Sequence, residues 1–289
     1  MYPGGVIIGG QVALMHLDGW TWEEMAVEKS LAMQMRFPAI ATSTFSRSFG
    51  SGRTSYAESK RRYDERVKST ADFFEQVRAY KQRKAAGGPG FQPERRLEAM
   101  LPVIDGKQPL MVFAPRERAA REAMAFAAKE KVKIILAGLR DSGPVLKEIA
   151  EKKIPVILGE TLALPLEEDS TYDEAYALPA ELHKAGVTFA FGTFSVEFAR
   201  NLAFQAASGV AFGLPHEEAL KAITINAAKI WGVDDRIGSI EKGKWADLIL
   251  TDGDPLEGRS QVKQMWIQGK AVSLETRHTK LYEQYMKRQ

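Results

Sequence analysis

The stretch AITINAAKIWGVDDRIGSIEKGKWADLIL, residues 222–250, changes from a helical pattern to a strand pattern around a glycine-rich turn. Its first part is rich in Ala and Ile and predicts a helix that ends near Gly232, because Gly commonly follows the last helical residue. Ala246–Leu250, apolar except for Asp247, reads as a buried-type strand, and the turn residues Asp252–Pro255 end it. A helical body therefore leads into a small β unit.

The residues after this stretch complete that unit. Val262–Ile267 and Ala271-Val272 flank Gln268-Gly269, which predicts a β-hairpin. A polar helical tail is expected over Lys280–Arg288. We expect a C-terminal β appendage with a helical tail over residues 236–289.

The residues before it carry four short apolar, β-prone runs. The runs begin 24, 22 and 31 residues apart, and they are Leu110–Phe113, Ile134–Leu136, Val156–Leu158 and Val187–Phe191. Helical patterns separate the first three, over Arg116–Lys129 and Pro144–Lys152, and residues 196–230 are almost wholly helical. Short all-apolar strands that alternate with amphipathic helices are typical of a parallel sheet covered on both faces. The expected fold class is α/β, with residues 99–235 as a run of strand–helix units.

Residues 1–98 form a third zone with a different composition. Short β-like runs at Val6–Ile8 and Val12–Met15 precede a basic helical segment, and Ala85–Gly90 reads as a linker. From Arg53 to Arg96 there are twelve Lys or Arg residues and six Asp or Glu residues. Because the two signs are interspersed, we interpret this segment as a solvated helix face rather than a nucleic-acid site.

Composition excludes several classes of protein. The 40 basic and 37 acidic residues give a net charge of +3, which is too small to indicate nucleic-acid binding. The absence of cysteine excludes a disulfide scaffold, a Cys-ligated metal and a thiol nucleophile. No apolar run reaches the roughly 20 residues of a membrane span, and the first residues do not read as a signal peptide. Location is unknown from sequence, and cytoplasmic by default.

The segment Leu220–Val233, with Thr224, Asn226 and Gly232 in a T-x-N-x-A-x-x-x-G-like pattern, is followed by G-S-I-x-x-G-K-x-A-D-L over Gly238–Leu248. These motifs resemble the C-terminal signature of the amidohydrolase superfamily, and of its imidazolonepropionase-like branch in particular. The resemblance implies a TIM-type (β/α)8 barrel, here only its later part, with part of a small composite β-sandwich built from both termini.

The resemblance also implies a hydrolase of non-peptide C–N bonds, such as cyclic amides, with a divalent metal such as zinc at the strand ends. Its ligands would be His-x-His on strand one, a carboxylated Lys or Glu on strand four, His on strands five and six, and Asp on strand eight. This sequence has no His-x-His, and Phe113, Ala137 and Phe194 occupy the positions of the other His residues and the Asp. We therefore expect a degenerate metal site, no metal ligands and no cofactor in this chain.

Polar residues follow the expected strands. Arg116, Arg140, Glu160, Thr193 and Ser195 are the candidates for binding a small molecule. Arginines at a barrel mouth can hold a carboxylate or phosphate with two hydrogen bonds, although ordinary helix caps would explain the same residues. The four histidines, His16, His183, His216 and His278, lack metal-ligand spacing, and only His16 is placed near a strand end.

Two functions remain open: a hydrolase that depends on residues from elsewhere, or a non-catalytic binding or scaffolding subunit that pairs with another amidohydrolase chain. An incomplete barrel leaves strand edges unpaired and invites association. The chain is then a fragment of a longer protein, the partner of a subunit that supplies the missing strands and His-x-His, or one half of a homo-oligomer. Neither nucleic acid nor a membrane is an expected partner.

Overall fold

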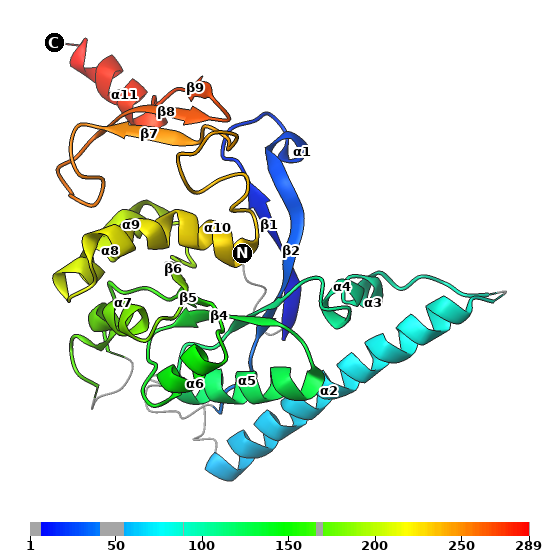
Figure 1. The fold of residues 1–289 in the computed structure, drawn as a ribbon. Helices are drawn as coiled ribbons and strands as arrows, with labels where there is room; N and C mark the ends of the chain where they lie inside the picture. The colour runs from blue at the N-terminus through cyan, green and yellow to red at the C-terminus, as the bar shows by residue number, and fades with distance from the viewer. Residues whose placement is uncertain (1–6, 41–54, 89, 166–169, 289) are drawn as a thin grey trace.

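The computed structural model describes residues 7–40, 55–88, 90–165 and 170–288. Its larger sheet has six strands in the order β1-β2-β3-β4-β5-β6 (Figure 1). These strands are β1 (Ile8–Met15), β2 (Ala26–Arg36), β3 (Leu110–Phe113), β4 (Ile134–Leu139), β5 (Val156–Leu158) and β6 (Phe189–Phe191). Strands β2 to β6 run parallel to their neighbours, and β1 runs antiparallel to β2.

This arrangement confirms a partial barrel. The strand order begins at β1 and ends at β6, so the described strands do not close. A closed barrel of this type needs eight parallel strands. The antiparallel β1 lies on the edge of β2 where such a barrel would place another parallel strand.

Helices cover the sheet and bridge its strands (Figure 1). The helices of the body are α1 (Trp22–Met25), α2 (Tyr56–Ala86), α3 (Arg95–Glu98), α4 (Leu101–Ile104), α5 (Glu117–Glu130), α6 (Val145–Glu151), α7 (Glu174–Lys184), α8 (Leu202–Ala211), α9 (His216–Ile223) and α10 (Ile225–Trp231), with a 3-10 turn at Ala199–Asn201. None of the described helices is both long enough and apolar enough to span a membrane.

Alternation along the strands sorts the core into two clusters. One side of β3 contributes Leu110 and Val112 to a large cluster with the helices, and α5 supplies Ala120 and Ala123 there. The other side contributes Met111 to a smaller cluster with Ala32, Ile135, Ala137 and Ile157, against which Phe113 and Phe194 pack. Because successive strand residues point to opposite faces, the smaller cluster lies on the face that a closed barrel would enclose.

The C-terminal unit is a three-stranded antiparallel sheet followed by a helix. Its elements are β7 (Leu248–Thr251), β8 (Val262–Ile267), β9 (Lys270–Val272) and α11 (Arg277–Met286). The predicted hairpin is confirmed, since Gln268 and Gly269 both have positive φ, as a type I′ turn requires. The predicted burial of β7 is wrong: Ile249 and Leu250 are 55% and 51% exposed because no described layer covers this sheet.

Other expectations differ in detail from the structure. The strand β2 was not predicted, and the two β-like runs near the start contribute to one strand, β1, with Val6 outside the described residues. The basic segment forms the 31-residue helix α2, whose charges pair within the helix, as in Arg62–Glu58 and Arg61–Glu65. These pairs support the interpretation of a solvated face.

Candidate functional site

Three residues mark the place where the resemblance puts metal ligands. Phe113 is the last residue of β3, Ala137 lies directly opposite it on β4, and Phe194 follows β6. The rings of Phe113 and Phe194 meet edge to face with centroids 5.5 Å apart. Ala137 is completely buried in the same apolar cluster. The structure thus brings the three predicted positions together at the carboxyl ends of the strands.

The backbone around these rings is adapted to them. Gly138 has φ +72°, and a β-carbon at this position would overlap the Phe113 ring. Phe194 itself has φ 49°, a left-handed conformation that costs a non-glycine residue roughly 1–2 kcal/mol. Gly192 is crowded by Phe194 and Ile157, so a β-carbon at Gly192 would contact both side chains at 2.8 Å. The aromatic rings are therefore integral to the packing of this end of the barrel.

Strand β2 adds two side chains that the sequence analysis missed. It lies next to β3, where the resemblance places strand four and its carboxylate ligand. Ala32 belongs to the inner cluster, so by alternation Gln34 and Arg36 share its face. The guanidinium carbon of Arg36 lies 4.8 Å from the centroid of the Phe113 ring. The alternation of Leu31, Met33 and Met35 with these residues was the signal that would have revealed the strand.

These residue types do not fit a catalytic metal. Zinc in proteins is held by nitrogen, oxygen or sulfur ligands at roughly 2.0–2.3 Å, and phenyl rings and a methyl group offer no lone pair. Arg36 adds a positive charge beside the rings, which disfavours a divalent cation. Within the ranges that the structure describes, no group of three or more His, Asp or Glu residues is placed to hold a metal ion.

The five candidate binding residues follow the same strand ends. Arg116 is the N-cap residue of α5, and Glu160 is half-buried after β5. Arg140 donates from Nη2 to the carbonyl of Leu164, 2.5 Å away, and thereby holds the loop after β5. Their role in binding a small molecule stays a prediction.

The loop after β6 is held by hydrogen bonds from its own hydroxyl groups. Thr193 donates from Oγ1 to the carbonyl of Ser195 at 3.2 Å, and Ser195 donates to Glu197 at 3.1 Å. These two hydroxyls therefore fix the loop that presents Phe194.

The histidines are placed away from the rim. His16 lies 3.0 Å from Asp247, and His216 lies 2.6 Å from Asp254. His183 lies 3.9 Å from Glu218, and His278 is exposed in α11. The first two pairs join the C-terminal unit to the body, which is a structural role.

Comparisons with known proteins agree with this architecture. The sequence profile of the amidohydrolase family matches residues 50–272. The crystal structure of an amidohydrolase from Thermotoga maritima MSB8 superposes with a TM-score of 0.74 at 28% identity, covering 92% of this chain and 69% of that one.

Curated relatives match over shorter segments. Imidazolonepropionase of Shewanella frigidimarina is 56% identical over 41 residues, 14% of this chain and 10% of that protein. Amidohydrolase tasK of Hapsidospora irregularis is 37% identical over 73 residues, 25% of this chain and 7% of that protein. The matches thus span a tenth or less of each of these two relatives.

Proposed function

This chain belongs to the amidohydrolase family, and from that premise we propose that it is a member without a metal site of its own, acting as a binding or scaffolding subunit. The observation that carries the proposal is the apolar cluster of Phe113, Ala137 and Phe194 at the strand ends. Members of the family with a metal activate water and polarise a carbonyl through it. Here the side chains at those positions have no donor atoms.

The packing around Phe113 and Phe194 supports the proposal that these rings are an integral part of the strand ends. Gly138 admits the Phe113 ring, and Phe194 keeps a strained backbone at the same place. Strain of this kind persists only where the surroundings stabilise it. These two features fit the rings and support the proposal that apolar packing takes the place of metal ligands at these strand ends.

A second candidate function is hydrolysis of a non-peptide C–N bond, such as that of a cyclic amide. The likeness to imidazolonepropionase and to the Thermotoga amidohydrolase favours it. It requires metal ligands from outside the described residues. A His-x-His segment supplied by another polypeptide would bring two ligands, and the positions on β3, β4 and after β6 would still bring none.

Metal analysis of the purified protein separates the two functions. The protein is incubated with zinc, manganese or iron, desalted and analysed by mass spectrometry, and its turnover of amides and lactams is measured. We expect substoichiometric metal and no chelator-sensitive turnover. About one ion per chain, as catalytic zinc sites hold, together with turnover that a chelator abolishes, would overturn the proposal.

The variant Phe113→Ala provides the matched control. An ion at the strand ends would lie beside this residue, so its affinity would change in the variant. Adventitious metal on the surface would be the same in both proteins. If the Phe113→Ala variant binds a metal ion as tightly as the wild-type protein does, the ion therefore lies elsewhere on the protein.

A further inference from the structure

A cavity of about 520 Å³ lies at the amino-terminal ends of β3, β4 and β5, the opposite end of the strands from Phe113. Much of its lining is apolar. Pro109 and Pro155 come from the residues that precede β3 and β5, and Ile230 comes from α10. Small-molecule sites in proteins have volumes of roughly 300–1,000 Å³ and mostly apolar linings. The cavity therefore has room for the apolar body of a small ligand.

The same cavity is basic. None of its described lining residues is Asp or Glu, whereas four are lysines. These lysines are Lys107 before β3, Lys133 before β4, and Lys152 and Lys153 before β5. Charges of one sign around a hollow with apolar walls concentrate the electric field and attract ligands of the opposite sign. The lining therefore favours an anion.

Helix ends explain only part of this charge. Cations stabilise the C-terminus of a helix, and Lys152 is the C-cap residue of α6, 2.6 Å from Glu148. Lys107 and Lys133 lie in the connections before β3 and β4, outside any helix. In the part of the chain that the structure describes, neither Lys133 nor Lys153 has an ion-pair partner. Local structure thus leaves two of the four charges unpaired.

Lys153 occupies a position where the backbone favours glycine. Its φ is 51°, a left-handed conformation that costs a residue with a β-carbon roughly 1–2 kcal/mol. After the next helix, α7, the corresponding position is Gly186 with φ 73°, again two residues beyond the helix end. The connection before β5 therefore gains nothing from a lysine, whereas the cavity gains a positive charge.

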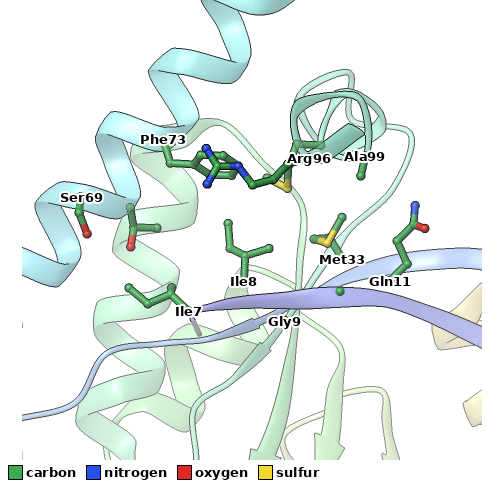
Figure 2. A pocket seen from close by; sticks show the side chains of 12 residues that line it. Ile7, Ile8, Gly9, Gln11, Met33, Ser69, Phe73, Arg96 and Ala99 are labelled. Atoms are coloured by element: carbon green, nitrogen blue, oxygen red, sulfur yellow. The ribbon is translucent and has the colours of Figure 1, made fainter. Parts of the chain in front are cut away.

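A larger cavity, beside β1, lacks this concentration of charge. It measures about 670 Å³, and its described lining includes a single basic residue, Arg96. Figure 2 shows the guanidinium of Arg96 over the Phe73 ring, and the two lie 5.1 Å apart. That cation is engaged with the protein itself. The lysine-lined cavity is thus distinguished by its charge rather than by its size.

We propose that the lysine-lined cavity binds an amphipathic anion, a small molecule with an apolar body and a phosphate or carboxylate group. The apolar body packs against the prolines and Ile230, and the lysines hold the anionic group. Each ammonium group has three donors and binds either anion without a fixed geometry. The site lies away from the strand ends that carry Phe113, so it does not depend on the proposed function.

Titration with octyl phosphate and with octanoate, followed by isoleucine methyl NMR, tests the proposal. Octanol and inorganic phosphate are the matched probes, since they carry only the apolar body or only the charge. We expect the methyl signals of Ile135 and Ile230, which line the cavity, to shift with at least one amphipathic anion, and Ile249 to stay unchanged. The tighter of the two anions identifies the anionic group.

The matched probes decide whether both parts of the ligand matter. We expect at least one amphipathic anion to bind about tenfold or more tightly than either octanol or inorganic phosphate, because it gains both apolar burial and charge pairing. Equal affinity for octanol or for inorganic phosphate overturns the proposal. Absence of shifts at Ile135 and Ile230 overturns it as well.

Two glycine variants test the charge at the cavity. Lys153→Gly removes a lining lysine, and Lys131→Gly removes a lysine with φ 56° that does not line the cavity. Glycine suits both backbone conformations, so both variants keep the fold. We expect the affinity for the tighter anion to fall about tenfold in Lys153→Gly, since a charge-assisted contact is lost, and by less than about twofold in Lys131→Gly. Equal losses indicate diffuse attraction and contradict a defined site.

A third variant tests the apolar part of the site. Ala128 is an exposed residue of α5 that lines the cavity. Ala128→Trp places a large ring there without disturbing the core, so we expect binding of the anion to be lost. Unchanged affinity in this variant shows that the ligand stays on the lysines outside the cavity, and the proposal then fails.

Discussion

The ring of Phe113 occupies the space in which a β-carbon on Gly138 would lie. The two residues are on neighbouring parallel strands, and Phe113 is opposite Ala137, the residue before the glycine. Gly138 also has φ +72°, a conformation that side chains other than glycine rarely adopt. Both steric room and backbone conformation therefore depend on this glycine.

The substitution Gly138→Ala is expected to lower the free energy of unfolding by roughly 2–4 kcal/mol, the sum of overpacking and left-handed strain. Urea unfolding measures the change. Gly106→Ala is the matched control, since Gly106 has φ +68° but open space around it, and only the strain of roughly 1–2 kcal/mol remains. Equal losses in the two variants would contradict the role of the Phe113 ring.

A double-mutant cycle with Gly138→Ala and Phe113→Ala tests the same contact through the free energy of unfolding. Removing the ring alone leaves a cavity and costs about 2–4 kcal/mol, since Phe113 is only partly buried. In the double variant the added methyl group enters that space, so we expect a loss smaller than the sum by about 1 kcal/mol or more. Strict additivity in urea unfolding would show that the two residues do not compete for space.

Part of this architecture follows from the sequence and part does not. The strands β3 to β6 are predicted because all-apolar runs such as Ile134–Leu136 recur between helical segments. The placement of Phe113 and Phe194 at one rim also follows, since parallel strands end at the same edge. The expected positions of metal ligands came from the resemblance, because periodicity alone does not identify them.

The missed features have physical reasons. The strand β2 includes charged residues such as Glu28 and Lys29 along its first half, because only its last four residues pair with β3. Burial of β7 was predicted from its apolar sequence, and sequence composition does not reveal whether another layer is present. The contact of Arg36 with Phe113 depends on strand register, which a residue pattern does not give.

The pair formed by His16 and Asp247 links residues 231 positions apart and fastens the C-terminal unit to the end of β1. Asp247 also accepts from the backbone N–H of Gln268 at 2.7 Å. Replacing it with Ala removes both hydrogen bonds, so we expect faster amide hydrogen exchange in β7–β9 and a loss of about 1–3 kcal/mol in local stability. His278→Ala, in the exposed helix α11, is the control and leaves the exchange unchanged.

Low pH is expected to destabilise the C-terminal unit. The backbone N–H of Gln261 lowers the pKa of Asp252, with a contribution from Lys263, and the N–H of Leu256 lowers the pKa of Asp254, with His216 adding to it. A carboxyl with a lowered folded-state pKa stabilises the fold above its ordinary value, and that contribution is lost as the pH falls through the folded pKa. The melting temperature is therefore expected to fall below about pH 4.

The variant Asp252→Asn/Asp254→Asn tests this origin of the acid sensitivity. It melts lower than the wild-type protein at pH 6, and its further decline toward pH 3 is smaller, because the two carboxylates that would be protonated are absent. Asp18→Asn, at an exposed position in the loop after β1, retains the wild-type profile. A double variant with the full wild-type decline would place the acid-sensitive groups elsewhere.

Gln205 and Thr161 are both 2% exposed, but the polar atoms of their side chains differ in hydrogen bonding. Thr161 donates from Oγ1 to the carbonyl of Gln205 and lies 3.0 Å from the hydroxyl of Ser208, whereas Oε1 of Gln205 has no hydrogen-bond partner. A buried polar atom without a partner costs free energy, and an apolar replacement of similar shape removes that cost.

Gln205→Met is therefore expected to be neutral or to stabilise the protein by up to about 1 kcal/mol in urea unfolding. Thr161→Val, of similar volume, is expected to destabilise it by about 1 kcal/mol because the hydrogen bond from Thr161 to the Gln205 carbonyl is lost, although Ser208 still donates to that carbonyl. A loss of more than about 2 kcal/mol in Gln205→Met would contradict the assignment and indicate that its amide binds an ordered water.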